Sequence, residues 1–572
     1  MSGKSKSVLA GTAVALLALG VLGPPGRTVP SGTVVVGLGG DPSSLDPGRV
    51  TSVRDGRLVR ALFEGLTVAD EETLAPLPGC AATWSVSPDQ RVWSFELVEG
   101  LRWSNGDLLV AEDFRRSWLR LLDPREGCPY AHLLWCIEGA RAYSEGRGDR
   151  EAVGIATPTP TRLVVRLETP LPHFLALTSS FPLVPVHGPS VEASAGSALT
   201  APSRLVSNGP YRLVERSLRE RVVVERNPHS HRAAEVAVPR IEYLATESAT
   251  TTLNLFLSGE VHWATAVPTT ILTRLVEDPR LADACTPRPH LESAFYRVNV
   301  TRPPFDDPRV RRALSLAIDR RVLCQEITRC GEQPAATFVP WPAPALAVLA
   351  PGATPPFPEY DRSVAPASGG ARHASEVAPE DWGGLLHDPE RARALLAEAG
   401  FRVPGRREGA ELPGFEIHYS ASPLHQRVAE WLQERWREEL GLEVRLRRSE
   451  GKSAIAEQRR LDYDVSRSSW VADYLDPMTF LEIFHSSAGP NRTGWADAEY
   501  DRCIEEAGRK PGGEERNRLL AAAERILLER GPIIPLWYGV TTTFVSPRLE
   551  GLGANALDQQ WPARFRWTEE RP

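Results

Sequence analysis

The chain has 572 residues, of which 42% are hydrophobic and 24% are charged, and its formal net charge is −7. A chain of this length and composition is able to bury the cores of two or more globular domains. The acidic balance argues against a nucleic-acid partner, because a basic surface is the usual footprint of such a protein.

The N-terminus has the pattern of an export signal. Lys4 and Lys6 precede an apolar run at 8–23, and Pro24 follows it directly. The run has 16 residues, which is short for a membrane-spanning helix of about 20 residues. We therefore predict that residues 1–31 form a secretory signal with a short linker and that the rest of the chain is exported. A signal that stays uncleaved and anchors the protein is left open.

The first half of the chain predicts a mixture of strands and helices. Residues 33–39 read as a buried strand, and 91–98 alternate between apolar and polar positions as a half-buried strand does. A helical stripe covers residues 114–122, and further strands are predicted at 162–168 and 221–227.

The second half alternates more regularly between the two kinds of element. Asp307 and Asp388 each precede a proline and predict helix starts, as N-cap and first helical residue. A strand at 415–420 is followed by a helix that Gly441 ends, and 442–447 alternate as the next strand. This β-α-β order predicts an α/β fold with a parallel sheet and helices packed on its faces.

A proline-rich segment separates these elements at residues 340–387. Seven prolines fall between 340 and 358, and a stretch rich in Ser, Gly and Ala follows. This composition predicts an extended surface loop.

Motifs for catalysis or metal binding are missing from the sequence. No H-E-x-x-H, G-x-S-x-G or G-x-x-x-x-G-K-[ST] pattern occurs, and none of the seven cysteines forms a C-x-x-C pair. An odd cysteine count leaves at least one thiol unpaired, and the sequence leaves a Cys128–Cys136 bridge open. We therefore predict neither an enzyme nor a bound cofactor or metal.

One carboxylate stands out in the stretch SSWVADYLDPMTF, residues 468–480. Asp473 lies among Trp470, Val471 and Tyr474, which read as strand or core. Because burying an unpaired charge is costly, we expect the Asp473 carboxylate to have a cationic partner.

Several segments together carry a resemblance to a known family. The segments are DPSSLDP (41–47), LFEGLTV (62–68), LRWSNGDLLVAEDFRRSW (101–118), SNGPYRL (207–213), RPPFDDPRVRRALSLAIDR (302–320), DPERARALLAEAGF (388–401) and WVADYLDP (470–477). In this order they resemble the periplasmic oligopeptide-binding proteins of ABC importers, the extracellular solute-binding family 5. The resemblance covers essentially all of the chain after the signal.

The resemblance implies a two-lobed α/β fold, the type II periplasmic binding protein, with a smaller domain inserted in the first lobe. It assigns lobe I to 32–68, 200–288 and 535–572, the inserted domain to 69–199, and lobe II, including the proline-rich loop, to 289–534. The ligand is expected between the lobes.

The resemblance also supplies the missing partner of Asp473. The acid of the W-x-A-D-Y motif in peptide-binding members pairs with the α-ammonium group of the peptide, and Asp473 matches this acid. Ser469, Trp470 and Val471 are then expected along the peptide main chain. Arg467 matches an arginine that meets the C-terminal carboxylate of short peptides, and His425 matches a histidine that serves longer ones.

Two further ligand contacts are expected in the first half of the chain, at Asp41 and Arg116. Some positions depart from peptide-binding members. Arg116 replaces a tyrosine, Gly451 a tryptophan, Gln458 a second arginine, and Val471 the cysteine of a binding-site disulfide. These departures leave the ligand's length and side chains open.

The predicted function is a monomeric periplasmic binding protein that delivers peptides to the permease of an ABC transporter. A lipid anchor is not expected, because the first cysteine is Cys80. The same fold with a nickel chelate, haem or oligosaccharide as ligand is an alternative. An exported hydrolase and a partner of a signalling receptor are less well supported by the sequence.

Overall fold

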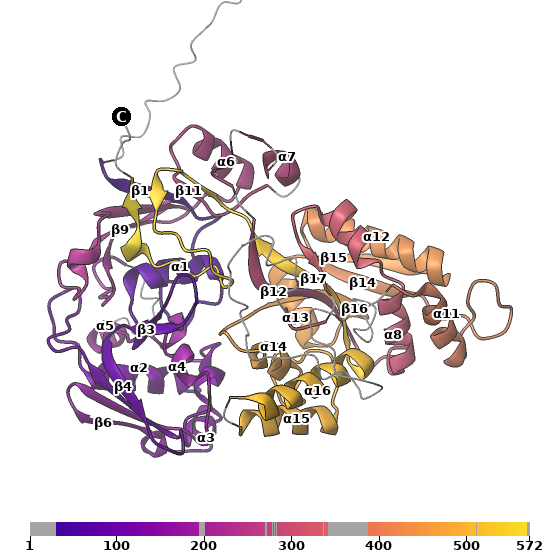
Figure 1. Cartoon of the computed structure of the whole chain (residues 1–572), viewed down its shortest axis with the longest axis horizontal. Helices are drawn as coiled ribbons and strands as arrows, with labels where there is room; N and C mark the ends of the chain where they lie inside the picture. Colours follow the sequence, from indigo (N-terminus) through magenta and orange to yellow (C-terminus); the bar gives the residue numbers. More distant parts are fainter. Residues whose placement is uncertain are drawn as a thin grey trace, which may run out of the picture.

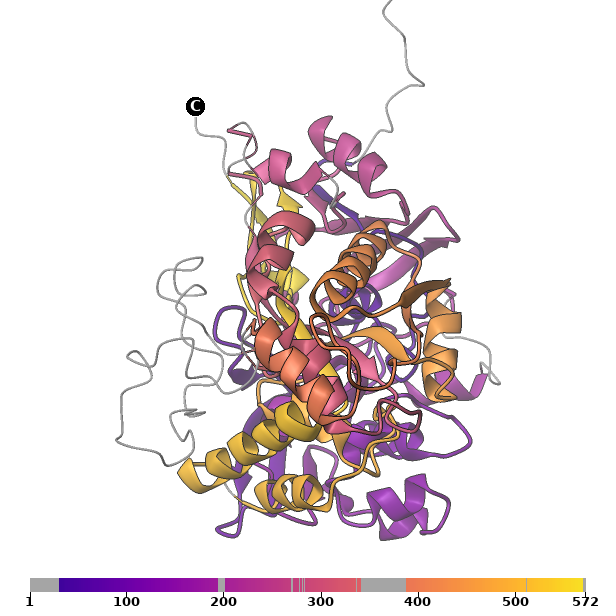
Figure 2. The same ribbon diagram turned by 90° about the vertical axis from the view of Figure 1, so that its right-hand side faces the viewer.

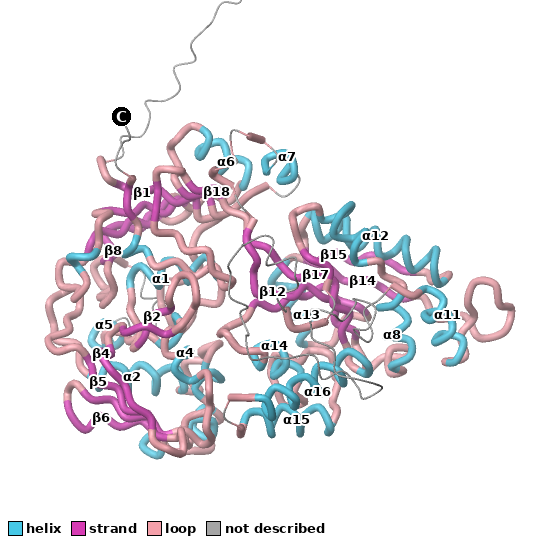
Figure 3. Tube along the Cα trace, in the orientation of Figure 1, coloured by secondary structure: helices cyan, strands magenta, loops and turns pink. Residues whose placement is uncertain are grey.

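The computed structural model describes residues 30–193, 201–340 and 387–568, apart from positions 269, 270, 277, 280, 282, 286, 336 and 511. The predicted signal at 1–31 and the proline-rich loop at 340–387 therefore lie almost wholly outside the described residues. Figure 1 shows two large lobes, with a smaller unit next to the first of them. The strands gather into three main sheets, one in each of these parts (Figure 3).

The sheet of lobe I contains the first strand of the chain. Its order is β18–β11–β1–β10–β9–β8, with bounds Phe544–Val545, Trp263–Ala264, Thr33–Gly37, Arg240–Leu244, Arg221–Arg226 and Tyr211–Ser217. β1 runs parallel to β10 and β11, whereas β9 is antiparallel to both of its neighbours. The strands predicted at 33–39 and 221–227 are confirmed. Helices α1 (Val53–Leu62), α6 (Ala249–Leu257) and α7 (Leu272–Val276) accompany this sheet.

The smaller unit is built on an antiparallel sheet in the order β4–β5–β7–β6. Its strands are Ala81–Val86, Val92–Leu97, Arg162–Arg166 and Ile155–Thr159. Its helices are α2 (Ala111–Leu122), α3 (Ala140–Ser144), α4 (Phe174–Leu177) and α5 (Gly188–Ala193), with short 3-10 turns η1 (Ala131–Leu134), η2 (Arg150–Ala152) and η3 (Phe181–Leu183). The hairpin of β2 (Thr67–Ala69) and β3 (Pro76–Pro78) lies between this unit and lobe I.

The sheet of lobe II has the order β13–β17–β12–β16–β14–β15. Its strands are Gln333–Pro334, Ile533–Thr541, Arg288–Val298, Val465–Val471, Phe415–Ser420 and Val444–Ser449. β14 and β15 are parallel, and helix α12 (Pro423–Leu440) connects them, so the predicted β-α-β unit is confirmed. Gly441 ends α12 in the left-handed region, with φ of 73°.

The other helices of lobe II surround this sheet. They are α8 (Pro308–Leu316), α9 (Arg320–Val322), η6 (Leu323–Thr328), α11 (Pro389–Glu398), α13 (Gly451–Arg459), α14 (Met478–Leu481), η8 (Glu482–Phe484), α15 (Ala498–Gly508) and α16 (Glu514–Arg530). The Asp307 and Asp388 side chains accept hydrogen bonds from backbone N–H groups in the first turns of α8 and α11, which confirms both predicted caps. In Figure 2 the gold pair at 498–530 lies below the orange elements of residues 389–449.

The C-terminal segment crosses from lobe II to lobe I. β17 pairs with β12 as far as Thr541, so the predicted limit at 534/535 falls within this strand. The chain then forms β18, the β19–β20 pair (Leu549–Glu550 and Arg566–Trp567) and the turn η9 (Pro562–Arg564). The domain limits themselves stay predictions.

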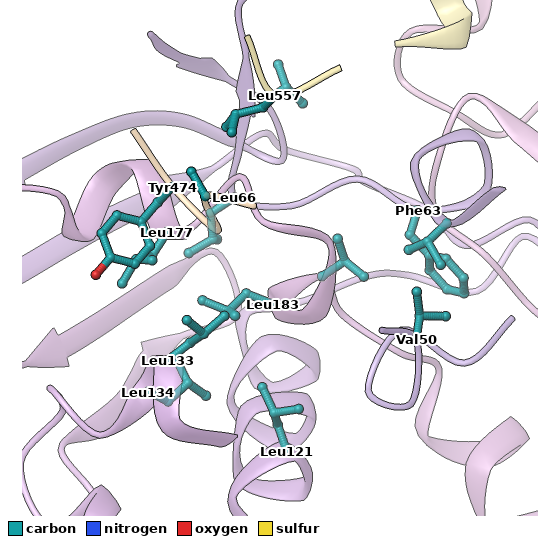
Figure 4. Packing of buried hydrophobic residues seen from close by; sticks show 14 of the residues in the cluster. Val50, Phe63, Leu66, Leu121, Leu133, Leu134, Leu177, Leu183, Tyr474 and Leu557 are labelled. Atoms are coloured by element: carbon teal, nitrogen blue, oxygen red, sulfur yellow. The ribbon is translucent and has the colours of Figure 1, made fainter. Parts of the chain in front are cut away.

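One buried apolar cluster extends from lobe I and the smaller unit into lobe II. It includes Leu66 and Leu177 from the first parts of the chain and Tyr474 from the loop after β16. Figure 4 shows these three side chains close together. A second cluster, with Tyr296 and Trp436, fills the space between the lobe II sheet and helices α8 and α12. The loop after β16 is therefore packed against both halves of the molecule.

Candidate ligand-binding site beside strand β16

Strand β16 has one edge that is only partly paired. On one side it pairs with β12 along its whole length, from Val465 to Val471. On the other side β14 pairs with it only at Val465 and Ser466. From Arg467 to Val471, this second edge has no partner strand in the described part of the chain.

The direction of the backbone groups follows from the alternation of an antiparallel ladder. The Ala472 N–H donates to the Leu291 carbonyl on the β12 side, at 2.8 Å. Alternate residues then direct their N–H and C=O groups to the opposite edge, and these are Arg467, Ser469 and Val471. The side-chain amide of Gln458 donates to the Arg467 carbonyl, at 3.0 Å. The backbone groups of Ser469 and Val471 are thus the ones that an added strand would meet.

Asp473 lies just beyond the end of this edge, in the turn between β16 and α14. Its backbone N–H donates to Thr479 Oγ1 at 3.0 Å, which fixes the turn. Within the described ranges, its carboxylate forms neither a hydrogen bond nor an ion pair. Burial without a partner raises the pKa of Asp473 to about 7. The carboxylate that the sequence singled out is therefore uncompensated by the protein.

The Asp473 carboxylate contributes to the raised pKa values of two neighbouring groups. Burial raises the pKa of Glu482 to about 7, and the Asp473 carboxylate adds to this rise. Burial also raises the pKa of Tyr130, again with a contribution from Asp473. Tyr130 belongs to the smaller unit, so Asp473 lies near a residue of that unit.

The loop that carries Asp473 is held firmly in place. The ring of Tyr474 stacks on that of His173, with centroids 4.2 Å apart and planes at 8°. The Tyr474 hydroxyl donates to Glu482 Oε1 at 2.7 Å. The buried carboxylate of Asp476 accepts two hydrogen bonds from Arg516, at 2.8 and 2.9 Å. These contacts fix the turn that follows Asp473 and join it to the smaller unit.

Arg467 and His425 come together at the other end of the edge. Arg467 Nη1 donates to Ser469 Oγ at 3.3 Å, and its Nε is buried without a partner. His425 lies in the first turn of α12, where its Nδ1 is 2.8 Å from Ser420 Oγ. Burial lowers the pKa of His425 to about 4, and the Arg467 charge adds to the effect, so the imidazole is neutral at pH 7.

Trp470 and Val471 point to opposite faces of the lobe II sheet. Trp470 packs against the large apolar cluster, and its Nε1 is buried without a hydrogen-bond partner. Val471 stands directly opposite Glu292 of β12. The six residues expected on or near β16 thus surround one edge and its two ends.

Asp41 and Arg116 lie elsewhere in the structure. Asp41 follows β1 in lobe I, and its Oδ1 is buried without a hydrogen-bond partner. Arg116, on α2, pairs with Asp113 at 3.7 Å and lies against Gly188 of α5, where it leaves no room for a side chain. Among described residues, neither forms a hydrogen bond or ion pair with β16 or its flanking turn.

Three residues near the site were missed by the sequence reasoning. Tyr130 faces Asp473, while Glu292 and His290 lie on β12 beside Arg467. The alternation in PHLESAFYRV, residues 289–298, is a strand signal that could have revealed β12. Only the pairing of β12 with β16 shows that Glu292 shares a face with Arg467.

Other kinds of site find no support in the described residues. Over these ranges no cluster of His, Cys, Asp and Glu has the makings of a metal site, and no helix meets the length and apolarity that a membrane span needs. Cys128 and Cys136 are both free thiols, so the bridge that the sequence left open is not formed. A cavity of about 30 Å³, between α1, η3 and the C-terminal segment, has room for about two waters and includes no residue of β16.

Comparison with known proteins identifies the family. The model of bacterial extracellular solute-binding proteins, family 5 (middle region), matches residues 75–492. The chain belongs to this family. It is therefore a solute-binding protein and not an enzyme, and its α/β fold is the predicted one.

The relatives agree over almost the whole chain. The periplasmic murein peptide-binding protein MppA of Escherichia coli is 30% identical and covers 92% of this chain and 93% of the relative. The periplasmic oligopeptide-binding protein OppA of Salmonella typhimurium is also 30% identical, with 97% of both chains covered. The probable deoxycholate-binding periplasmic protein YgiS of Escherichia coli is 31% identical over 89% of both chains, so ligands differ within the family.

Solved structures give the same picture. The murein tripeptide binding protein MppA of Escherichia coli matches with a TM-score of 0.78 at 28% identity, over 94% of this chain and 99% of that one. The unliganded open form of MppA matches with a lower TM-score of 0.70. Haemophilus influenzae OppA in complex with the peptide RPPGFSPFR matches at 0.77 and 27% identity, with 94% and 99% of the two chains covered.

Proposed function

We propose that this protein captures peptides between its two lobes and delivers them to the permease of an ABC transporter in the inner membrane. The observation that carries the proposal is the open edge of β16, which ends at the uncompensated carboxylate of Asp473. An extended peptide would add to this edge as a strand and place its α-ammonium group at Asp473.

The arrangement suits ligands of varied sequence. The backbone groups of Ser469 and Val471 recognise the peptide main chain, which is the same in every peptide. The Asp473 carboxylate recognises the terminal ammonium, which is also independent of side chains. In this proposal Trp470, Arg467 and His425 border the peptide on β16 and α12, and Asp41 and Arg116 approach it from lobe I and the smaller unit.

Delivery follows from closure of the lobes around the ligand. A ligand that contacts both lobes binds the closed form more tightly and shifts the population toward it, which signals occupancy to the permease. Three relatives carry "periplasmic" in their names, and the predicted N-terminal signal fits a periplasmic location. We propose that the protein works there as a monomer.

The proposal is tested with tetra-alanine and its backbone N-methylated forms, using protein that has been unfolded and refolded to remove co-purified ligand. An N-methyl group removes one amide donor and blocks strand addition at that residue. Tetra-alanine has three amide N–H groups, at residues 2, 3 and 4. Methylation at residue 2 or at residue 3, whichever N–H faces β16, should weaken binding about tenfold in calorimetry, the value of roughly one hydrogen bond. Equal affinity for all methylated forms, or no binding of tetra-alanine, would contradict the proposed function.

A second candidate is a non-peptide ligand, supported by the relative named as probably deoxycholate-binding. Deoxycholate carries a carboxylate and no ammonium group, so an ionised Asp473 would repel it. Competition between deoxycholate and tetra-alanine separates the two candidates. If tetra-alanine fails to bind in the same assay, a nickel chelate, haem or oligosaccharide becomes the favoured kind of ligand.

A further inference from the structure

A carboxylate of the protein itself lies on the same face as Arg467. Glu292, on β12, stands directly opposite Val471, and Tyr296 stands opposite Arg467. Directly opposite residues of an antiparallel pair share a face, and so do alternate residues along one strand. Glu292, Val471, Ser469 and Arg467 are therefore on one face of the lobe II sheet.

The Ser469 hydroxyl group lies between the two opposite charges along this face. Arg467 Nη1 donates to Ser469 Oγ at 3.3 Å, and Ser469 is the next residue on this face before Val471, which stands opposite Glu292. On the other side, His290 Nδ1 lies 3.6 Å from Glu292 Oε2. Burial opposes the ionised form of Glu292, but His290, Arg467 and Ser469 together lower its pKa to about 2.

The neighbouring strand leaves space for this side chain. Gly539 of β17 lies against Glu292, and a Cβ at position 539 would come within 2.8 Å of Glu292 Oε2. A larger residue would therefore displace the carboxylate. The position of Glu292 depends on three strands, β12, β16 and β17, rather than on a mobile surface loop.

Two further titratable groups of the described chain, His425 and Glu332, lie near this face. His425 is neutral at pH 7, as its low pKa shows. Glu332 is a second carboxyl group close to Glu292, and burial raises its pKa. An incoming carboxylate would thus meet Arg467 together with an ionised Glu292.

We propose that Glu292 is a specificity-determining residue, which supplies Arg467 with an internal counter-charge through Ser469 and so removes the requirement for a ligand carboxylate at this end of the site. This inference rests on the proposed function. It implies that the site takes peptides whose chain continues past Arg467, or whose C-terminus is neutral, as readily as short free acids.

The first test compares trialanine with trialanine amide, which differ only in the charge at the C-terminus. Wild-type protein should bind the two within about threefold of each other in calorimetry. Glu292→Gln should favour the free acid at least tenfold over the amide, because Arg467 then lacks its counter-charge. The double variant Glu292→Gln/Arg467→Gln should lose that preference. A tenfold preference already present in wild type, or an unchanged ratio in Glu292→Gln, would overturn the inference.

A second test needs no ligand and so separates this inference from the proposed function. Thermal unfolding of ligand-free wild type, Glu292→Gln, Arg467→Gln and the double variant gives a cycle for the pair. We expect each single variant to lower the Tm and the double variant to lower it by clearly less than the sum. Additive Tm shifts would overturn the pairing. If trialanine fails to bind while the cycle is non-additive, the pairing stands and the peptide assignment fails.

Discussion

The two ends of the open edge of β16 carry opposite charges, and the protein treats them differently. At one end the Arg467 guanidinium donates to Ser469 and shares a face of the sheet with Glu292, which we propose as its internal counter-charge. At the other end the Asp473 carboxylate has no partner in the part of the chain that the structure describes, and burial raises its pKa to about 7. Of the two ends of this edge, the uncompensated one is negative, so we expect its electrostatic selectivity to favour a cation.

The surroundings of Asp473 explain how the fold tolerates this charge. The buried Asp476–Arg516 pair and the Tyr474–His173 stack hold the turn without help from Asp473. Because the Asp473 carboxylate is not needed for these contacts, it is available to the ligand. Arg467, in contrast, does form a side-chain hydrogen bond within the lobe II sheet, to Ser469.

The largest expected effect comes from neutralising the uncompensated end. Asp473→Asn keeps the shape of the side chain but removes the charge that faces the ligand ammonium. A hydrogen bond to a charged group contributes about 1.5–3 kcal/mol, and breaking a buried ion pair costs about 3–5 kcal/mol. Affinity for tetra-alanine should therefore fall roughly 10- to 1000-fold, at about 1.4 kcal/mol per factor of ten, as calorimetry would measure.

A matched control is available in the same turn. Glu482 is also buried, and its pKa is raised to about 7, but its carboxylate is engaged by the Tyr474 hydroxyl. Glu482→Gln should change the affinity by less than about threefold, which is roughly 0.7 kcal/mol. If Glu482→Gln loses as much affinity as Asp473→Asn, any carboxyl group in this turn would affect binding. The proposed difference between Asp473 and Arg467 would then not explain the loss.

A change of pH should also alter the affinity for tetra-alanine through Asp473, with a somewhat smaller effect than Asp473→Asn. Asp473 has a pKa of about 7 in the ligand-free protein, and a bound ammonium group lowers it. Protonation therefore competes with the ligand, and affinity for tetra-alanine should fall about tenfold from pH 8 to pH 6. At the Arg467 end, Glu292 has a pKa of about 2 and His425 a pKa of about 4, so neither of these two groups titrates between pH 6 and 8. Asp473→Asn should flatten the profile, and an equal slope in that variant would assign the effect to Glu482 or another group.

The same pKa shift acts on stability with a defined sign. The folded-state pKa of Asp473 lies above the value of 3.8 of an exposed carboxyl, so the folded state binds the proton more tightly. The contribution of Asp473 to stability is fully present below pH 3.8 and is lost as the pH rises through 7. Ligand-free Asp473→Asn should therefore gain in Tm over wild type at pH 8 and lose this gain near pH 4.

The smallest expected effect concerns a residue outside the edge. Arg116 is 39% exposed and pairs with Asp113 at 3.7 Å within α2. Exposed ion pairs contribute about 0–1 kcal/mol, so Arg116→Ala should alter tetra-alanine affinity by less than about threefold. A loss of tenfold or more would mean that Arg116 contributes far more to ligand binding than an exposed contact does, and the charge of the site would then have to be reconsidered.

The sequence predicts the local parts of this structure well. Alternation identifies β5 and β15, and the Asp-Pro pairs at 307 and 388 mark the starts of α8 and α11. These signals depend on residues close together in the chain. Asp473 also stands out locally, because a carboxylate among aromatic residues needs a partner.

The sequence does not reveal what the long-range pairing creates. β12 and β16 are separated by more than 160 residues, and only their register places Glu292 on the face of Arg467. The open edge of β16 has the same origin, because it depends on β14 ending its pairing at Ser466. Both features arise from how strands line up in the sheet, which no local pattern encodes.

The central claim, that Asp473 is an uncompensated charge waiting for the amino terminus of a peptide, is tested most directly by one double-mutant cycle. Calorimetry compares tetra-alanine and N-acetyl-tetra-alanine on wild type and on Asp473→Asn. The account predicts that acetylation weakens binding to wild type at least tenfold and hardly weakens binding to the variant further. If acetylation has the same effect on both proteins, the coupling is zero, Asp473 does not recognise the ammonium group, and the claim is contradicted.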